Sequence, residues 1–287
     1  MTTDDEHVDG SDATPAMTPP PGTQTLIRGL RVLDAIADWD RPVGVGELAR
    51  QLALPKSTVH RLLRTLEQEG WAETSADPVT RWSLSPHMWV IARRHEPLTG
   101  LREAAMPHVN LLAERTGETI HFSVPDRDLQ LVLIDRVDSM QAVRTYNAIG
   151  ASTPCHASAS GKAVLAMLPD DEVDDILSRP LAKPTPNTNV DPQYLRHQIL
   201  EARERGYAVN VSESRAHVCA IAAAIADRSG RPVAAVAISM PDIRFVADRV
   251  PEWGTWVSAA ARTIGETLAG MNDQRSSRRP AVTRPSN

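Results

Sequence analysis

One short stretch, LPKSTVHRLLRTLEQEGW at residues 54–71, combines basic and hydroxyl side chains and has no carboxylate before Glu67. Short hydroxyls at the start of a helix can meet phosphate oxygens beside the backbone amides, and arginine can form two parallel hydrogen bonds with guanine. The stretch therefore has the chemistry to bind a polyanion. Any solvated surface helix also has polar residues outside, so the charge of this stretch alone leaves both interpretations open.

A helix would place these side chains on one face. Apolar residues recur at helical spacing and form one stripe, which consists of Val59, Leu62, Leu63 and Leu66. The residues between them must then point outward, and these are Lys56, Ser57, Thr58, His60, Arg61 and Arg64. This outer face has one sign of charge, whereas a merely solvated helix usually alternates acidic and basic residues.

The elements around the stretch favour the polyanion interpretation. Residues 24–37 and 45–52 have the apolar spacing of two helices, and a three-residue turn separates the second from the helix that follows. Residues 71–74 and 81–84 alternate around the turn-forming sequence SADPV, which predicts a hairpin in the position of a wing. The order is that of a winged helix-turn-helix over residues 24–85. The inward residues expected for the first helix are Leu26, Leu30, Leu33 and Ala37.

Length and charge suggest two domains with tails. The 287 residues have a formal net charge of -5, so any affinity for nucleic acid must come from a local patch. Residues 1–23 are acidic and residues 272–287 are basic and rich in Pro and Ser, and we expect both tails to be disordered. No apolar run approaches the roughly 20 residues of a membrane span. We therefore expect a soluble, cytoplasmic protein without membrane contact.

The second half alternates short apolar runs with helices. The runs TIHFSV, LQLVLIDRV and MQAVRTYN (140–147) predict an antiparallel meander, and three more predicted strands follow between residues 207 and 240. The fold class is therefore α+β. Along RPVAAVAISM, Val236 and Ile238 lie on one side of the strand and Ala235 and Ala237 on the other. The small-residue side could line a hollow for a small molecule, or it could let a helix pack closely.

Four blocks of this sequence resemble the IclR family of bacterial transcription regulators. They are TLIRGLRVLDAIAD, VGVGELARQLALPKSTVHRLLRTLEQEGW, TPCHASASGKAVLAMLP and RGYAVNVSESRAHVCAIAAAIADRSGRPVAAVAISMP, and the resemblance covers about residues 24–270. It implies a winged helix-turn-helix, a linker helix over 86–100, and a GAF-like effector-binding domain over 101–271 with a curved antiparallel sheet. Ala53 departs from the family pattern, which usually has glycine in that turn. If this residue is left-handed, alanine costs on the order of 1 kcal/mol.

The resemblance implies a sequence-specific DNA-binding regulator controlled by a small organic acid or aromatic metabolite. The outward residues of the 56–64 stretch would contact the major groove of a double-stranded operator, with Arg81 on the wing and Arg28 on the first helix supporting the backbone. Homodimers are expected, and in the family such dimers often pair again into tetramers. The effector-binding positions carried over are Ala157, Ser158, Asn210, Glu213, Ala220, Ala237 and Ser239. Asn210, Ala220 and Ala237 depart from the family pattern, which favours a less polar or larger effector.

Other functions have weaker support. The segment ASASGKA lacks the spacing of a phosphate loop, and no nucleophile with a base, paired carboxylates or cofactor loop appears, so we expect no catalytic residues and no cofactor. Cys155, His156, His217 and Cys219 could bind a metal only if their two segments meet, and buried thiols with unrelated histidines are the more frequent case. His121 and Arg144 lie on predicted strands and can point either way, Arg144 toward an anionic effector or toward Asp135. A winged protein-interaction module and an enzyme with an accessory winged domain remain as alternative functions.

Overall fold

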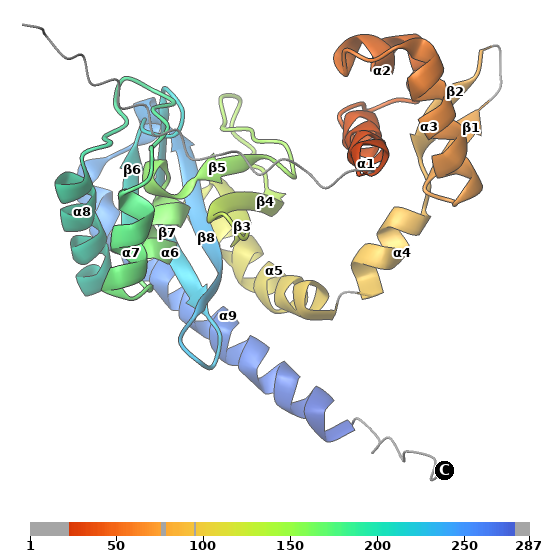
Figure 1. Cartoon of the computed structure of the whole chain (residues 1–287). Coiled ribbons are helices and arrows are strands. Elements are labelled where there is room, and N and C mark those ends of the chain that lie inside the picture. Colours follow the sequence, from red (N-terminus) through yellow and green to blue (C-terminus); the bar gives the residue numbers. More distant parts are fainter. Residues whose placement is uncertain (1–22, 76–78, 95, 279–287) are drawn as a thin grey trace, which may run out of the picture. The chain divides into compact units, whose positions relative to one another are not determined.

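The computed structural model describes residues 23–75, 79–94 and 96–278 (Figure 1). The chain divides into two compact units, residues 1–95 and 96–287, and each is described by itself. The predicted acidic tail, apart from Thr23, lies outside the described residues, as does the part of the predicted basic tail after residue 278. In the described parts of the chain, no helix is both long enough and apolar enough to span a membrane.

The first unit is a winged helix-turn-helix, as predicted. Its elements are α1 (Gln24–Ala37), α2 (Val45–Gln51), α3 (Lys56–Gln68), β1 (Ala72–Ser75), β2 (Arg81–Leu84) and α4 (His87–Arg94). The two strands form an antiparallel pair, and a single bridge from Val43 to Trp82 attaches the wing to the segment before α2. Leu48, Val59, Leu63 and the fully buried Trp82 belong to one core that α1, α2, α3 and the wing share.

Helix α1 buries a different stripe from the one predicted. Leu26 and Leu30 are 63% and 52% exposed, and Ala37 is also exposed. The buried residues are Val32, Leu33, Ala35 and Ile36. The helix has two apolar stripes, and its periodicity does not determine which of them faces α3. The stripe through Leu26 and Leu30 therefore remains on the surface of this unit.

Ala53 adopts the left-handed conformation that was expected for this turn, with φ +52°. The amide of Leu54 donates to the carbonyl of Ala49 at 3.1 Å, and the amide of Ala53 donates to that of Arg50 at 3.4 Å. These two bonds close the end of α2 in the manner that usually places glycine at the left-handed position. The turn between α2 and α3 thus contains a strained alanine.

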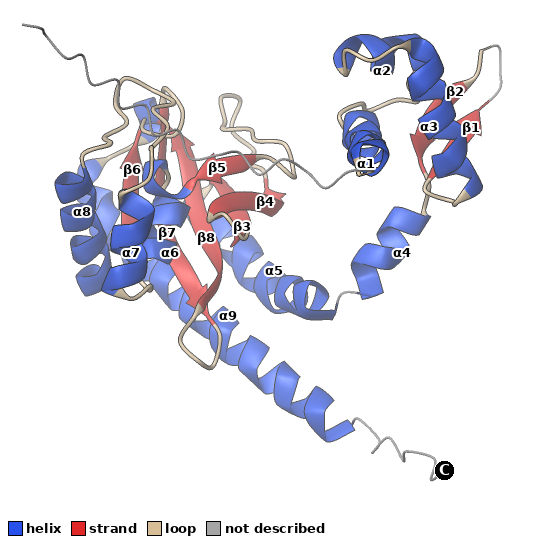
Figure 2. Cartoon of the chain, viewed as in Figure 1, coloured by secondary structure: helices blue, strands red, loops and turns tan. Residues whose placement is uncertain are grey.

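The second unit is built on a six-stranded antiparallel sheet with the order β5-β4-β3-β8-β7-β6 (Figure 2). Its strands are β3 (Thr119–Pro125), β4 (Gln130–Val137), β5 (Ser152–Pro154), β6 (Ala208–Val211), β7 (Val218–Ala226) and β8 (Pro232–Pro241). Its α-helices are α5 (Glu96–Thr116), α6 (Ala159–Leu165), α7 (Asp170–Leu177), α8 (Pro192–Arg205) and α9 (Val250–Arg278). The sheet is curled, in agreement with the predicted α+β class.

Helices cover both faces of the sheet. Helices α5 and α9 pack on the face that carries Val236, Ile238 and Met240. Helix α6 packs on the opposite face, where Ala159 and Ala163 lie in one cluster with Ala222, Ala235 and Ala237. The small side chains therefore do allow a helix to pack closely on the sheet. They also border a cavity at one end of this face.

Two predicted elements differ from the structure. Residues 140–147, predicted as a strand, form none. Side chains take the place of a neighbouring strand here, since Arg244 donates to the carbonyl of Val143 and Arg136 donates to the carbonyl of Asn147. The predicted linker region contains the end of α4, described up to Arg94, and the start of α5, described from Glu96, and residue 95 between them lies outside the described residues. Helix α9 continues into the predicted basic tail as far as Arg278, because after its first turn no proline interrupts it before residue 280.

Candidate nucleic-acid interface and effector cavity

The outer face of α3 presents all six residues predicted for DNA contact. Lys56, Ser57, His60, Arg61 and Arg64 are exposed, and Thr58 is half-buried. The opposite face of the helix buries Val59, Leu62 and Leu63 in the core of the first unit. The helical period therefore separates the apolar and basic faces as expected.

A carboxylate at the end of α3 holds both Arg64 and the wing. Arg64 Nη1 lies 2.7 Å from Glu67 Oε2, and the Thr74 hydroxyl on β1 donates to Glu67 Oε1 at 2.8 Å. The bond from Thr74, together with Arg64, lowers the pKa of Glu67. Glu67 thus pairs with Arg64 on the helix surface and also attaches the wing to the end of the helix.

Arg81 lies on the wing, as predicted, but it pairs with a carboxylate of α2. Its Nη1 is 2.8 Å from Glu47 Oε2, while Arg41 Nη2 is 2.7 Å from Glu47 Oε1. The Gly44 amide also donates to Glu47 at 2.8 Å. The hydrogen bond from Arg41, followed by that from Gly44, lowers the pKa of Glu47 to about 2. Arg81 therefore ties the wing to α2, and Arg28 stands exposed on α1.

A cavity opens on the small-residue face of the sheet in the second unit. Of the seven predicted effector residues, five line it, namely Ser158, Asn210, Ala220, Ala237 and Ser239. Strand register brings them together from distant parts of the chain: Asn210 pairs with Ala220, which pairs with Ser239. His121 pairs with Ala237 and so lies on the same face.

The cavity also has polar lining that the prediction missed. These residues include His121, Ser123, Asn147, Thr153, Ser160 and Ser214. The departures at Asn210, Ala220 and Ala237 favour a less polar or larger effector, but this additional lining supplies polar groups that the prediction did not include. His121 and Ser123 reach the cavity through the register of β3 against β8, and Asn147 through the path of the 139–151 segment, and both are tertiary information.

The two remaining predicted effector residues do not line the cavity. The carbonyl of Ala157 accepts a hydrogen bond of 2.7 Å from Asn210 Nδ2. Glu213 turns the other way, and its carboxylate oxygens lie 2.8 Å and 3.0 Å from Lys162 Nζ. Both residues therefore support the cavity from behind, because each fixes a neighbour that lines it.

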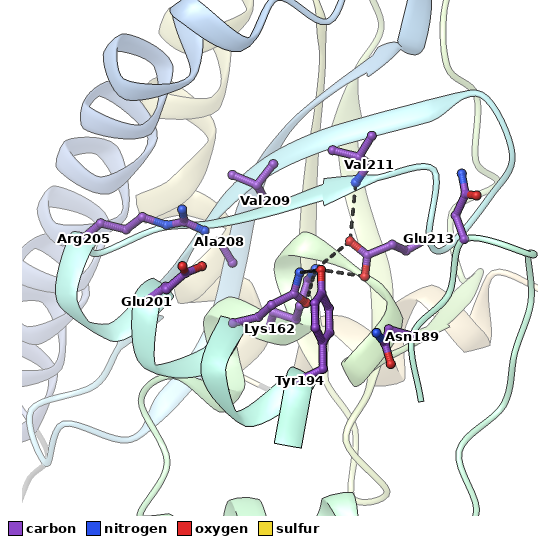
Figure 3. A pocket seen from close by; sticks show the side chains of 11 residues that line it. Lys162, Asn189, Tyr194, Glu201, Arg205, Ala208, Val209, Val211 and Glu213 are labelled. Carbon is purple, nitrogen blue, oxygen red and sulfur yellow. Dashed lines mark hydrogen bonds and ion pairs between the residues drawn. The ribbon is translucent and has the colours of Figure 1, made fainter. Parts of the chain in front are cut away.

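Lys162 and Glu213 meet at the base of a second, polar pocket between α6, α8 and β6 (Figure 3). The Lys162 side chain is 1% exposed and that of Glu213 is 10% exposed. Gln198 Oε1 accepts a further bond of 3.2 Å from Lys162 Nζ. Burial lowers the pKa of Lys162, and the attraction of Glu213 opposes this effect.

His121 is the titratable side chain that reaches the effector cavity. It is 8% exposed, and its Nε2 atom forms no hydrogen bond with the residues that the structure describes. Burial, reinforced by the nearby Arg136, lowers the pKa of His121 to about 4. The imidazole is therefore neutral at physiological pH.

The residues considered for a metal do not form a site. His156 Nε2 lies 2.8 Å from the carbonyl oxygen of Ala182, and His217 is an exposed residue with φ +62° that precedes β7 and contacts Asp242. Both Cys155 and Cys219 are buried, which raises their thiol pKa values, that of Cys155 to about 11. Within the described ranges, no group of three or more His, Cys, Asp or Glu side chains could hold a metal.

Arg144 does not pair with Asp135, one of the two partners that the sequence left open for it. Asp135 Oδ2 instead lies 2.5 Å from Arg102 Nε, on α5. The error follows from the missing strand, because Arg144 was expected to lie on a strand beside β4.

Comparison with known families decides the class of this protein. Residues 25–76 match the IclR helix-turn-helix domain, and residues 98–266 match the C-terminal domain of bacterial IclR transcriptional regulators. The chain belongs to the IclR family. It is therefore a DNA-binding transcriptional regulator.

Curated IclR relatives extend over most of the chain. The transcriptional repressor IclR of Escherichia coli K12 is 35% identical over 262 residues, which cover 90% of this chain and 95% of the relative. The regulator KdgR of Dickeya chrysanthemi is 30% identical and covers 88% of this chain and 82% of the relative. The similarity thus includes both units.

Solved IclR structures have the same fold. An IclR homologue from Microbacterium hydrocarbonoxydans, complexed with 4-hydroxybenzoate, has a TM-score of 0.73 and 27% identity and covers 86% of this chain and 99% of that protein. The IclR of Thermotoga maritima has a TM-score of 0.70 and 28% identity, and the match covers 85% of this chain and 98% of that protein.

Proposed function

We propose that this IclR-family regulator contacts its double-stranded operator with the outer face of α3, and that a small molecule in the cavity of the second unit controls the binding. The observation that carries the first part is the single sign of charge on residues 56–64 of that face, opposite the buried apolar face. Lys56, Ser57, Thr58, His60, Arg61 and Arg64 would contact the major groove and its phosphates. Arg28 and Arg81 would contact the phosphate backbone of the operator DNA.

Substitution of arginines on α3 tests this assignment. Arg61→Ala and Arg64→Ala remove exposed side chains from the surface opposite the core, so the fold should be retained. Each should weaken operator binding about 5- to 150-fold in a gel-shift titration, since a good bidentate base contact contributes about 1–3 kcal/mol. Arg127→Ala, at a site 92% exposed in the second unit, is the charge-matched control and should bind like the wild type.

Two results would contradict the recognition face. One is wild-type operator affinity in both α3 variants, with circular dichroism showing intact helices. The other is an affinity that does not change with salt, because phosphate contacts release counterions and make binding steeply salt-dependent. Low affinity for all DNA would instead favour a protein-interaction role for the winged unit.

We further propose that the regulator acts as a homodimer, because one α3 helix presents too few contacts for specific binding. Leu26 and Leu30 form an exposed apolar stripe on α1, which a second copy of the chain would cover. The operator would then be a palindrome or repeat with half-sites at the dimer spacing. Analytical ultracentrifugation of Leu26→Asp, beside the wild type, measures this: the wild type should sediment as a dimer or a dimer of dimers, and the variant at a lower mass.

The cavity supports control by a small organic acid or aromatic metabolite. It lies on the small-residue face of the sheet, and polar side chains from several strands and loops converge on it. The structural relative that is complexed with 4-hydroxybenzoate agrees with such a ligand. An effector can change operator affinity only if it binds two poses of the protein with different affinities. Such a regulator would work in the cytoplasm, without a catalytic activity or a cofactor of its own.

A further inference from the structure

An unpartnered histidine faces the effector cavity. Strand β3 places His121 beside Ala237 of β8 in register, so both side chains lie on the face that borders the cavity. The Nε2 atom is fully shielded from solvent by the protein, yet it makes no hydrogen bond with the described residues. A buried polar atom without a partner costs about 1–3 kcal/mol, so a ligand that supplies the partner recovers this free energy.

The charges around His121 favour an anion. On β4, its register partner Arg136 has its Nε 2.7 Å from Asp138 Oδ1 and also donates to the carbonyl of Asn147. Arg215 reaches the same residue and donates to Asn147 Oδ1 at 3.3 Å. The guanidinium groups of Arg136 and Arg215 thus both contact Asn147, which lines the cavity. The carboxylate of Asp138 offsets part of their positive charge.

The other elements around the cavity bring no further charge to its lining. Strand β8 contributes Ala237 and Ser239, and the segment from β6 to β7 contributes Asn210 and Ser214. Helix α6 contributes Ser160, while its charged residue, Lys162, faces away and pairs with Glu213. His121 is the one titratable residue among the described residues that line the cavity.

We propose that His121 determines the specificity of this cavity for a carboxylate, and that it takes up a proton when the carboxylate binds. The bound acid accepts a hydrogen bond from Nε2–H, and the added proton resides on the imidazole as an imidazolium ion paired with the acid. This assignment rests on the proposed effector function of the same cavity. It names the chemical class of the effector and the residue that selects it.

Linkage gives the direction of the pH dependence. In the free protein the imidazole is neutral, because burial and Arg136 both disfavour its charged form. A carboxylate beside it restores at least the ordinary histidine pKa of about 6.5. Affinity for the acid must then be higher below that value and decline as pH rises through it. Between pH 5.5 and 7.5 the dissociation constant should increase about tenfold, over a range in which a carboxylic acid probe stays ionised.

Calorimetric titration of the full-length protein tests the proposal with three acids and their neutral amides. The probes are propionate, benzoate and 4-hydroxybenzoate, with propionamide, benzamide and 4-hydroxybenzamide. We expect at least one acid to bind more tightly than its amide, with the tenfold pH dependence and with proton uptake in buffers of different ionisation enthalpy. His121→Gln keeps an N–H donor but does not titrate, so its dissociation constant for the same acid should change less than twofold with pH.

His217→Gln is the matched control, because it removes an exposed histidine of the same unit and should keep the wild-type pH dependence. The failures are distinguishable. Amides that bind as tightly as the acids would overturn the carboxylate assignment and leave effector binding intact. Equal pH dependence in His121→Gln and the wild type would overturn the role of His121. Absence of binding by every probe would overturn this proposal, while operator binding by the wild type would still support the DNA-binding part of the proposed function.

Discussion

Removal of one member of the buried pair between Lys162 and Glu213 should destabilise the second unit strongly. Lys162→Met keeps the length and the apolar stem of the side chain but removes the ammonium group (Figure 3). Among the described residues, the Glu213 carboxylate then keeps only a weak bond of 3.5 Å from the amide of Val211. A buried charge without its partner typically costs about 3–5 kcal/mol.

This cost corresponds to a large change in melting temperature. In a domain of this size, 1 kcal/mol corresponds to about 2–4 °C, so the transition of the second unit should fall by about 6–20 °C. Glu213→Gln leaves the Lys162 ammonium group unpaired and should lower the melting temperature of the second unit by a similar amount. The double variant Lys162→Met/Glu213→Gln removes both charges and should recover much of the loss, since replacing a whole buried pair is often nearly neutral.

Differential scanning calorimetry of the full-length chain measures these changes at neutral pH. The unfolding transition whose temperature changes in Lys162→Met is that of the second unit. The first-unit variant Ala53→Gly identifies the other unfolding transition. A loss below about 2 °C in both single variants would show that water or side-chain rearrangement compensates the orphaned charge. Losses that simply add in the double variant would show that the two groups do not interact. Either result would refute the reasoning.

Two further predictions concern the first unit and use the same calorimetric assay. Ala53→Gly should raise the melting temperature of the first unit by about 2–8 °C. The relief of left-handed strain exceeds the free-energy cost of the added entropy of the unfolded chain by about 0.5–1 kcal/mol. An unchanged or lower melting temperature would contradict this. The pKa of Glu47 is lowered to about 2, so its bonds to Arg41 and Gly44 contribute stability above about pH 4.5 that is lost as pH falls toward 2. Glu47→Gln should therefore lose less stability than the wild type between pH 5 and pH 3, and equal losses would contradict this.

The outward residues of α3 could be predicted because one strong period determines them. Once Val59, Leu62 and Leu63 are buried, the helical geometry leaves no other place for Arg61 and Arg64. The same reasoning failed for α1, where two apolar stripes compete. Packing against α3 decides between them, and that contact is tertiary information that the sequence of α1 does not contain.

The cavity could be predicted only in part. Alternation along β8 identified the small-residue face correctly, since that depends only on the period of two. His121 and Ser123 were missed because their face depends on which strand pairs with β3, and in what register. Asn147 was missed because residues 140–147 alternate like a strand and were predicted to form one. Side chains from distant segments bind carbonyls of this segment instead, and the sequence of the segment does not contain that information.

The position of Glu213 links the buried pair to the cavity. Its amide donates to Asn210 Oδ1 at 3.0 Å, and Asn210 Nδ2 donates to Ser214 Oγ at 3.2 Å. Asn210 and Ser214 line the cavity, while the Glu213 carboxylate between them is held by Lys162 on the other side. The pair thus anchors the loop that presents two polar groups to a ligand. Lys162→Met should accordingly weaken binding of an acid to a similar extent at every pH, whereas His121→Gln should alter the pH dependence itself.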